Sequence, residues 1–416
     1  MSSRAHTARA RTTTTRKPRD PWPDNARFIA ALLIVMMHFG DQVPGKSDLL
    51  EHVFFLTWPA RVPLYALLAG YFSDASPFTR RRAVGLVRNV LLVYLCFEML
   101  ATVHKWLLGG RFAFDPGTPS LALWFLLSLF IWRAILPLLA TIRWIVPLSV
   151  VVALVAGFAP SIGPAGSMSR TVAFLPVFLL GWKLRQHGLR EVLDRTWVRW
   201  AAAGVLLVWS AAIVAILADG DLKRRWFSMV KPYAQSNLVG DLEARTLVLV
   251  GGGMLAALAV LALAPRSRLP WISYLGTGSM YIYLLHPFLV RQAVDAGLLE
   301  RLDSRTDVVL MLAGTALVGA LLATPPVRRL LRPIIQPTYT WLFLPEPSAP
   351  RRDAPVTEPE RPSAHDASVS GATASPTNVP TENLDNIAVA GHAVPAVHLD
   401  DAPASHAPRP EDPHRS

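Results

Sequence analysis

Long apolar runs, separated by clusters of charged residues, constrain this chain of 416 residues more than any other feature. The runs at 83–103 and 246–264 are each close to the roughly 20 residues with which an α-helix crosses a hydrocarbon layer about 30 Å thick. Hydrophobic residues make up 52% of the sequence, and a soluble protein with this many such runs would expose too much apolar surface. The sequence therefore predicts an all-α, multi-pass membrane bundle and not the buried core of a large soluble protein.

The apolar runs predict about ten membrane-spanning helices. Lys and Arg number 23 in the alternate connections that begin with the N-terminal arm, and 12 in the opposite connections. Because cytoplasmic loops of membrane proteins carry an excess of Lys and Arg, this bias predicts an even number of spans in the inner (cytoplasmic) membrane, with both termini in the cytoplasm. The expected spans are, approximately, 24–40, 53–72, 83–103, 121–140, 144–159, 171–183, 200–218, 246–264, 272–291 and 307–324.

The two ends of the chain differ in composition from the membrane domain, which is predicted at 22–335. Residues 1–21 are basic and lack the apolar core of a secretory signal peptide, which predicts a disordered cytoplasmic arm. Residues 345–416 contain five Arg, eleven Asp plus Glu and no Phe, Trp or Tyr. Because such a segment cannot bury enough apolar surface to fold, we expect a disordered Pro-, Ala- and Asp-rich cytoplasmic tail.

The net charge of +12 narrows the choice of partners. A basic protein can bind nucleic acid, but here the positive residues occupy short loops beside apolar spans. We therefore expect membrane lipids or an anionic cofactor as partners, and no nucleic acid. Cys96 is the single cysteine, so an internal disulfide or a Cys-rich metal site is impossible, and no metal is expected. A lone cysteine in an apolar run is more often a packing residue than a catalytic thiol.

The first span contains ionisable residues that a lipid environment should exclude, and such residues favour function over packing. Arg27 and His38 are eleven residues apart, which is three helical turns plus about 20° of rotation, so both side chains share one face about 16 Å apart along the axis. Asp24 lies three residues before Arg27 and can hold its guanidinium. A histidine can accept and return a proton near neutral pH, and a hydroxyl needs such a base to become a good nucleophile. The competing interpretation is a His38 that only hydrogen-bonds across the bundle.

One arginine stands within or at the edge of the second span, and three more follow the span. Arg61 lies between Pro59 and Pro63, which free backbone carbonyls that need partners. Arg61 could pair with those carbonyls, bind an anionic ligand or extend to the outer surface. After the span, Arg80, Arg81 and Arg82 form a positive cluster that suits lipid headgroups or the phosphates of a soluble cofactor.

Three further residues are weaker candidates. Glu98 in the third span needs a partner, and His38 and Arg61 are the possibilities considered. His286 directly precedes Pro287, which disfavours helical geometry at the histidine and favours a structural role at a helix break. Trp124 suits packing or the membrane interface, with lining of a pocket as the alternative.

At these residues the chain resembles the acyltransferase-3 family, the bacterial membrane-bound acyltransferases that modify sugars and other hydroxylated acceptors. The resemblance covers roughly residues 22–330 and rests on four stretches in the family's order: DNARFIAALLIVMMHF, RVPLYALLAGYFS, LWFLLSLFIW and YIYLLHPF. It implies an acyl-CoA donor, with acetyl-CoA the first choice, that enters from the cytoplasmic side. It also implies that His38 acts in transfer and that Arg27 helps to hold the donor or the shape of the site. Arg61 falls where relatives carry His or Arg, and an arginine cannot serve as a base.

Together these observations favour an O-acyltransferase that acts on a hydroxyl of a glycan, glycolipid or similar acceptor in the cell envelope. In this mechanism Arg27 and residues 80–82 hold the donor phosphates, and His38 moves the proton from the hydroxyl to the departing thiolate. A transporter of a lipid-linked glycan or polar metabolite would also explain the spans and the buried charges. A non-catalytic membrane scaffold that recruits partners through its acidic tail is the third possibility.

Overall fold

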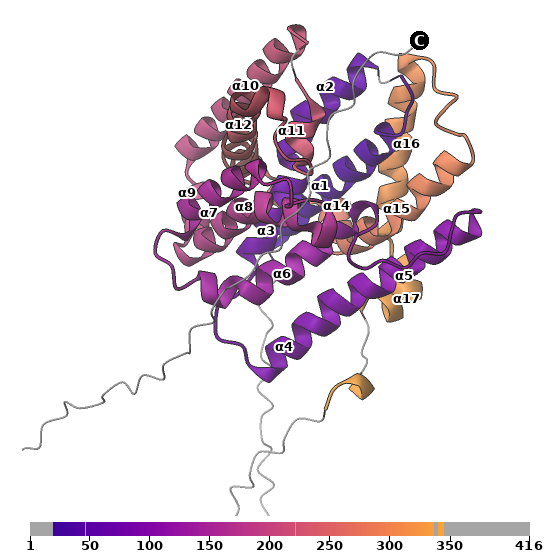
Figure 1. Cartoon of the computed structure of the whole chain (residues 1–416), viewed down its shortest axis with the longest axis horizontal. Coiled ribbons are helices and arrows are strands. Elements are labelled where there is room, and N and C mark those ends of the chain that lie inside the picture. The colour runs from indigo at the N-terminus through magenta and orange to yellow at the C-terminus, as the bar shows by residue number, and fades with distance from the viewer. Residues whose placement is uncertain (1–19, 46, 221, 337–339, 345–416) are drawn as a thin grey trace, which may run out of the picture. The chain divides into compact units, whose positions relative to one another are not determined.

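The computed structural model describes residues 20–45, 47–220, 222–336 and 340–344, and every regular element in these residues is a helix (Figure 1). The chain divides into two units, residues 1–346 and 347–416, and all the described residues belong to the first. The all-α prediction is therefore confirmed. The disorder predicted for the acidic tail, and for nearly all of the basic arm, concerns residues outside the described ranges.

The longer helices follow the order of the apolar runs. They are α1 (Pro21–Gly40), α2 (Asp48–Thr57), α3 (Val62–Tyr71), α4 (Arg80–Leu86), α5 (Leu92–Leu107), α6 (Trp124–Leu139), α7 (Ile145–Val155), α8 (Met168–Gln186), α10 (Thr196–Ala218), α12 (Leu238–Thr246), α13 (Ala257–Leu263), α14 (Pro270–Gly276), α15 (Ser279–Asp295), α16 (Arg305–Leu322) and α17 (Pro325–Ile335). Short helical segments connect or extend them: η1 (Trp58–Ala60), η2 (Val87–Leu91), η3 (Leu121–Leu123), η4 (Ala156–Phe158), η5 (Ala165–Ser167), α9 (Leu189–Leu193), α11 (Arg224–Ser228), η6 (Gln235–Asn237), η7 (Leu247–Ala256) and η8 (Thr340–Leu342).

Within the described residues, five helices are long and apolar enough to cross a membrane. They are Asp48–Tyr71, Arg80–Leu107, Thr196–Ala218, Gln235–Leu263 and Arg305–Leu322. The other predicted spans coincide with helices that are shorter or carry more polar residues, such as α1, α6 and α15. The protein is thus a multi-pass helical membrane protein, whereas ten spans and two cytoplasmic termini stay predictions.

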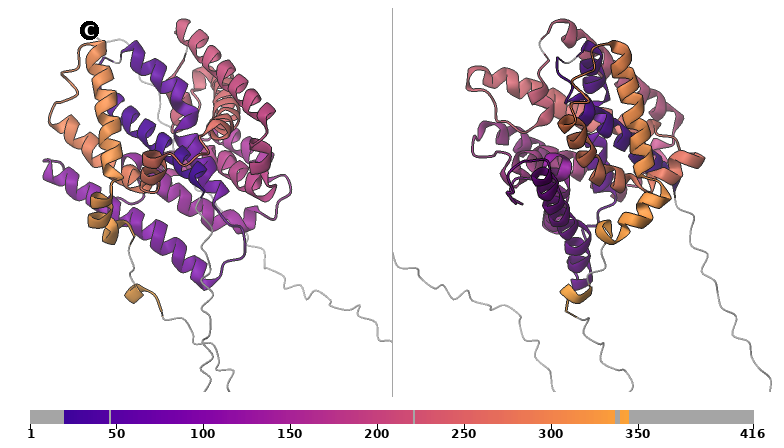
Figure 2. Two further views of the ribbon diagram at one scale, coloured as in Figure 1. Left: turned by 180° about the vertical axis from the view of Figure 1, so that it is seen from behind. Right: turned by 90° about the vertical axis from the view of Figure 1, so that its right-hand side faces the viewer.

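Helix α1 lies in the middle of the bundle, where it packs against α3, α14, α15 and α16 (Figures 1 and 2). It begins at Pro21 because proline suits the first helical position and the Asp20 carboxylate accepts a hydrogen bond from the Trp22 amide at 3.3 Å. The Trp22 indole donates to the carbonyl of Leu261 on α13 at 3.0 Å. The Asn25 side-chain oxygen accepts from the Ser273 hydroxyl on α14 at 2.6 Å. These bonds hold the start of α1 in place.

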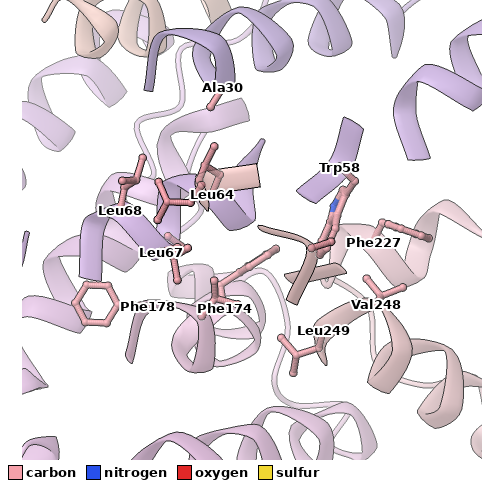
Figure 3. Close-up of a cluster of buried hydrophobic side chains, with 14 of the residues drawn as sticks. Ala30, Trp58, Leu64, Leu67, Leu68, Phe174, Phe178, Phe227, Val248 and Leu249 are labelled. Carbon is pink, nitrogen blue, oxygen red and sulfur yellow. The ribbon is translucent and has the colours of Figure 1, made fainter. Parts of the chain in front are cut away.

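The bundle is tightest where α3 crosses α8. A Cβ atom on Gly70 would lie 1.8 Å from the carbonyl oxygen of Phe178, and one on Gly181 would lie 1.9 Å from that of Leu67. Small residues let membrane helices approach this closely, so van der Waals packing replaces the hydrophobic effect that lipid cannot supply. Leu67 and Phe178 belong to the buried apolar cluster drawn in Figure 3.

Two predicted spans are interrupted, the second beside Pro59 and Pro63 and the ninth away from Pro287. The second span breaks at η1 and restarts as α3 after Arg61. The ninth divides into α14 and α15, with the break at residues 277–278. The helix break predicted at His286 is wrong, because α15 continues through His286 and Pro287. Membrane helices tolerate an internal proline because neighbouring groups satisfy the carbonyl that it frees.

Candidate active site

A cavity of about 400 Å³ lies beside α1, between α3, α6 and α15. It contains both residues of the predicted pair, Arg27 and His38, together with Trp124. Its other polar or aromatic side chains are Tyr65, Phe72, Asn89, Phe125, Arg133, Thr277, Ser279 and Tyr283. The helical spacing therefore placed Arg27 and His38 correctly on one face, turned toward the protein interior.

Arg27 is held by two contacts at its guanidinium and by a third at its backbone. Its Nη1 lies 3.5 Å from an Asp24 carboxylate oxygen, as the i,i+3 spacing suggested, and Asp24 is itself buried. The ring of Phe72 packs against it, with the guanidinium carbon 4.4 Å from the ring centroid. The Tyr65 hydroxyl donates to the Arg27 carbonyl at 3.0 Å, which ties α3 to this turn of α1.

His38 is held in one tautomer by its own helix. Its Nδ1 lies 2.9 Å from the carbonyl oxygen of Ile34, one turn earlier. Because a carbonyl only accepts, Nδ1 carries a hydrogen, so Nε2 holds the lone pair whenever the ring is neutral. A neutral imidazole with one fixed N–H and one free lone pair can act as a general base.

A second imidazole lies directly beside the first. The ring centroid of His286 is 4.9 Å from that of His38, with an angle of 53° between the planes. His286 is fully buried, its Nδ1 lies 3.0 Å from the Ile282 carbonyl, and its Nε2 has no hydrogen-bond partner within the described part of the chain. The structure therefore brings His286 to His38, although the sequence analysis assigned it to a helix break.

Arg133 is the residue of the cavity that the sequence analysis missed as a site residue. It lies inside α6, and its Nε donates to the Ser73 hydroxyl at 3.1 Å. Arg133 is one of the 23 Lys and Arg assigned above to the cytoplasmic connections, although it lies seven residues before the end of the predicted span 121–140. An arginine inside a predicted span is costly, and that cost was the available signal.

The lining of this cavity is electropositive. It contains two arginines, Arg27 and Arg133, and among its described residues no carboxylate. Aromatic and aliphatic side chains form most of the remaining wall. Such a surface can receive an elongated ligand that has an anionic end and an apolar body.

Arg61 is buried but does not line the cavity. Its Nη2 donates to the carbonyl of Phe54 at 2.5 Å, and its guanidinium carbon lies 4.5 Å from the centroid of the Phe54 ring. Of the options that the sequence left open, pairing with a carbonyl near the proline-rich break is the one observed.

The arginines at the start of α4 also lie outside the cavity lining. Arg80 and Arg81 are exposed, whereas Arg82 is partly buried. Arg80 donates to the carbonyl of Leu344. Arg82 donates to the carbonyl of Asp74 at 2.5 Å and pairs with its carboxylate at 3.5 Å. Two of the three guanidinium groups therefore have protein partners in this structure.

The partner of Glu98 is neither of the two considered. Its carboxylate accepts hydrogen bonds from the backbone amide of Ser120 at 3.0 and 3.2 Å and from the Ser120 hydroxyl at 2.5 Å. Ser120 is distant in sequence and precedes η3, so only the folded chain brings it to α5. Glu98 therefore belongs to a region separate from the His38 cavity.

An all-helical body with several apolar, bilayer-length helices, and a protein-lined cavity that holds a histidine beside arginines, fits the class of multi-pass membrane acyltransferases. The family model described as an acyltransferase domain, acyltransferase-3, matches residues 20–324. Because this match covers most of the chain, the protein belongs to the acyltransferase-3 family. Comparisons with curated proteins and with solved structures give no significant match.

Proposed function

We propose that the protein is an O-acyltransferase that moves an acyl group, acetyl being the first choice, from cytoplasmic acyl-CoA to a hydroxyl of a glycan, glycolipid or similar acceptor. The observation that carries this proposal is that Arg27, Arg133 and His38 line a single cavity. Family membership supports acyl transfer, and the cavity supports a specific donor geometry.

The donor has to match a cavity that has arginine side chains at one end and the imidazole of His38 at the other. Arg27 and His38 lie about 16 Å apart along α1, from the helical rise of eleven residues. An acyl-CoA carries phosphates at one end and its thioester at the other end of a flexible arm. Phosphates beside Arg27 and Arg133 would therefore leave the thioester near His38. Residues 80–82 would contact the outer phosphates after they release their present partners.

The reaction follows from the tautomer of His38. Nε2 takes the proton of the acceptor hydroxyl while the hydroxyl oxygen attacks the thioester carbonyl carbon. A carbon–oxygen bond forms, the carbon–sulfur bond breaks, and the proton passes from His38 to the departing thiolate of CoA. The imidazole ends in its starting state, so it turns over without a cofactor of its own.

The decisive experiment measures release of the CoA thiol from acetyl-CoA by the purified full-length protein, with a cell-envelope extract as the source of acceptor. We expect His38→Ala to slow release by about 10²- to 10⁴-fold, the usual contribution of a general base. His52→Ala is the matched control, because His52 makes the same bond to a carbonyl one turn earlier but lies outside the cavity lining. A wild-type rate in a folded His38→Ala protein would reject the mechanism, and a protein that only transports would release no thiol.

The donor geometry is tested by Arg133→Gln in the same assay. Loss of a charged contact to phosphate costs about 1.5–3 kcal/mol, so we expect the KM for acetyl-CoA to rise about 10- to 100-fold. Arg143→Gln is the control, since Arg143 is exposed and packs on Trp144 outside the cavity. An unchanged KM in Arg133→Gln would show that the donor phosphates do not bind at this end of the cavity.

A further inference from the structure

Two of the helices that are long enough to cross a membrane end beside the same surface. One is Gln235–Leu263, and the loop 264–269, which contains Arg268, follows it. The other is Arg305–Leu322, and α17 begins only two residues after its end (Figures 1 and 2). Because a membrane-spanning helix ends close to the edge of the hydrocarbon layer, the segments that follow these two helices lie at a bilayer boundary.

Arg328 on α17 joins the two segments. Its Nη1 donates to the Thr277 hydroxyl at 2.8 Å, and its guanidinium carbon lies 5.9 Å from the centroid of the Tyr274 ring on α14. The loop before α14 is also fixed by α1, because the Asn25 side-chain amide donates to two of its carbonyls at 2.8 and 3.1 Å. The two spans therefore end on the same face of the bundle.

Helix α17 turns an apolar side toward the bundle and its basic side outward. Ile335 is buried, and Leu331 and Ile334 pack in the same apolar cluster. Arg329 and Arg332 are both exposed, and their i,i+3 spacing makes them neighbours on the outer side. The helix contains no acidic residue that could neutralise them. It therefore presents a concentrated positive charge at the end of a span.

A cavity of about 330 Å³ lies beside this helix, between α14 and the start of α1. Arg268 lines it and is exposed, and Arg328 bonds to another lining residue, Thr277. Asp24 is the single carboxylate among the described residues of the lining, and it already pairs with Arg27 at 3.5 Å. The cavity can thus receive a polar headgroup whose phosphate contacts guanidinium groups.

Large apolar side chains are exposed beside these arginines. Trp271 lines the cavity and is 77% exposed, and Leu330, next to Arg329 in the chain, is also 77% exposed. Tryptophan is enriched at membrane–water interfaces, where its ring contacts the acyl region. An arginine beside it can reach the headgroups at the same depth. A soluble anion would leave both apolar side chains in water, whereas a phospholipid covers them.

We propose that Arg268, Trp271, Arg329, Leu330 and Arg332 form a boundary surface that binds an anionic phospholipid. The arginines bind the phosphate, the cavity receives the rest of the headgroup, and the two apolar side chains contact the acyl chains. An anionic lipid is preferred over a zwitterionic one, because the ammonium group of the latter would be repelled by three guanidinium groups. Lipid binding here does not depend on acyl transfer.

Native mass spectrometry of the purified full-length protein tests the charge requirement. From an equal mixture of dioleoylphosphatidylglycerol and dioleoylphosphatidylcholine, we expect the wild type to retain the phosphatidylglycerol. Arg329→Gln/Arg332→Gln should weaken its retention about 25-fold, since each arginine near an anionic surface contributes about fivefold. Arg301→Gln/Arg305→Gln is the matched control, because it removes two exposed arginines at the other end of α16, beside Glu300.

Fluorescence quenching tests the contact with the acyl chains. Bromine atoms on a lipid chain quench only indoles that the chain approaches closely. We expect the difference in quenching between the wild type and Trp271→Phe to be severalfold larger with brominated phosphatidylglycerol than with brominated phosphatidylcholine. Trp144→Phe is the control, because Trp144 is 67% exposed and stands beside an arginine but is not part of the boundary surface. For this variant the two lipids should give equal differences.

Three results would overturn the boundary surface as a phospholipid site. The first is equal retention of the two lipids by the wild type, and the second is unchanged retention in Arg329→Gln/Arg332→Gln. The third is displacement of phosphatidylglycerol by CoA together with a raised KM for acetyl-CoA in Arg268→Gln, which would assign the surface to the nucleotide end of the donor. Loss of acetyl-CoA turnover alone would overturn the proposed function and leave lipid binding intact.

Discussion

At the scale of single residues, hydrogen bonds to the helix backbone determine what the two buried histidines can do. His38 and His286 each bond through Nδ1 to the carbonyl four residues earlier. Both rings therefore present Nε2 as an acceptor, and the two rings lie 4.9 Å apart. In the proposed mechanism His38 takes a proton, and the lone pair of His286 lies nearby, where it can stabilise the charge. His286 then acts through His38 as a positioning residue, because it does not itself line the cavity that holds His38.

This arrangement predicts a change in kcat without a change in donor binding. We expect His286→Phe to lower kcat for acetyl-CoA about tenfold or more while KM stays within about twofold, because Phe removes the lone pair that lies beside the protonated His38 of the proposed mechanism. His286→Gln, which retains a polar acceptor, should recover part of the loss. A rise in KM with an unchanged kcat would mean that His286 only shapes the cavity.

At the scale of helices, the crossing of α3 and α8 sets the position of the cavity that holds Arg27 and His38. Tyr65, Leu68 and Ala69 on α3 line that cavity. Their distance from α1 depends on how closely α3 packs on α8, and Gly70 and Gly181 permit the contact. The prolines of the chain act differently from one another: the second span breaks at η1, beside Pro59, whereas α15 continues through Pro287.

Glycine substitution tests this crossing. Gly181→Ala should lower the thermal unfolding temperature and acetyl-CoA turnover together, because its Cβ would lie 1.9 Å from the Leu67 carbonyl oxygen and the helices must separate. Gly204→Ala on α10 is the control, since its Cβ meets nothing within 4 Å and alanine has the higher helix propensity. Equal melting temperatures for the two variants would contradict the close crossing.

At the scale of the whole chain, the matched region contains the cavity that holds Arg27 and His38. The family match ends at residue 324, and this cavity is lined by residues before that point. Helix α17 follows the matched region and packs against α5 and α16. Helix α17 therefore supports the bundle, although none of its residues lines the cavity that holds His38.

Two truncations distinguish the tail from the membrane domain. Deletion of 345–416 should leave acetyl-CoA turnover within about twofold of the full chain, because the deleted residues follow the matched region and are not among those that line the cavity of Arg27 and His38. Deletion of 325–416 should lower both turnover and thermal stability, because it also removes α17. Loss of turnover in the shorter deletion would favour a scaffold that works through its tail.

The sequence by itself determined the features that depend on local periodicity. Long apolar runs predicted a multi-pass helical protein, and the eleven-residue spacing predicted that Arg27 and His38 share a face with Asp24 at the guanidinium. These are properties of one helix, and helical geometry is the same in every context. The motifs around them also led to the correct family.

Only the tertiary structure decided which distant helices meet. His38 lies beside His286, and Arg133 lines the cavity that holds His38. Glu98 accepts a hydrogen bond from Ser120, and Arg61 bonds to the Phe54 carbonyl outside the site. In a bundle of mostly apolar helices, hydrophobic periodicity carries little information about neighbours, because lipid and protein interior solvate an apolar face about equally well. Close contacts of small residues and a few buried hydrogen bonds determine which helices become neighbours. These contacts exist only in the packed bundle.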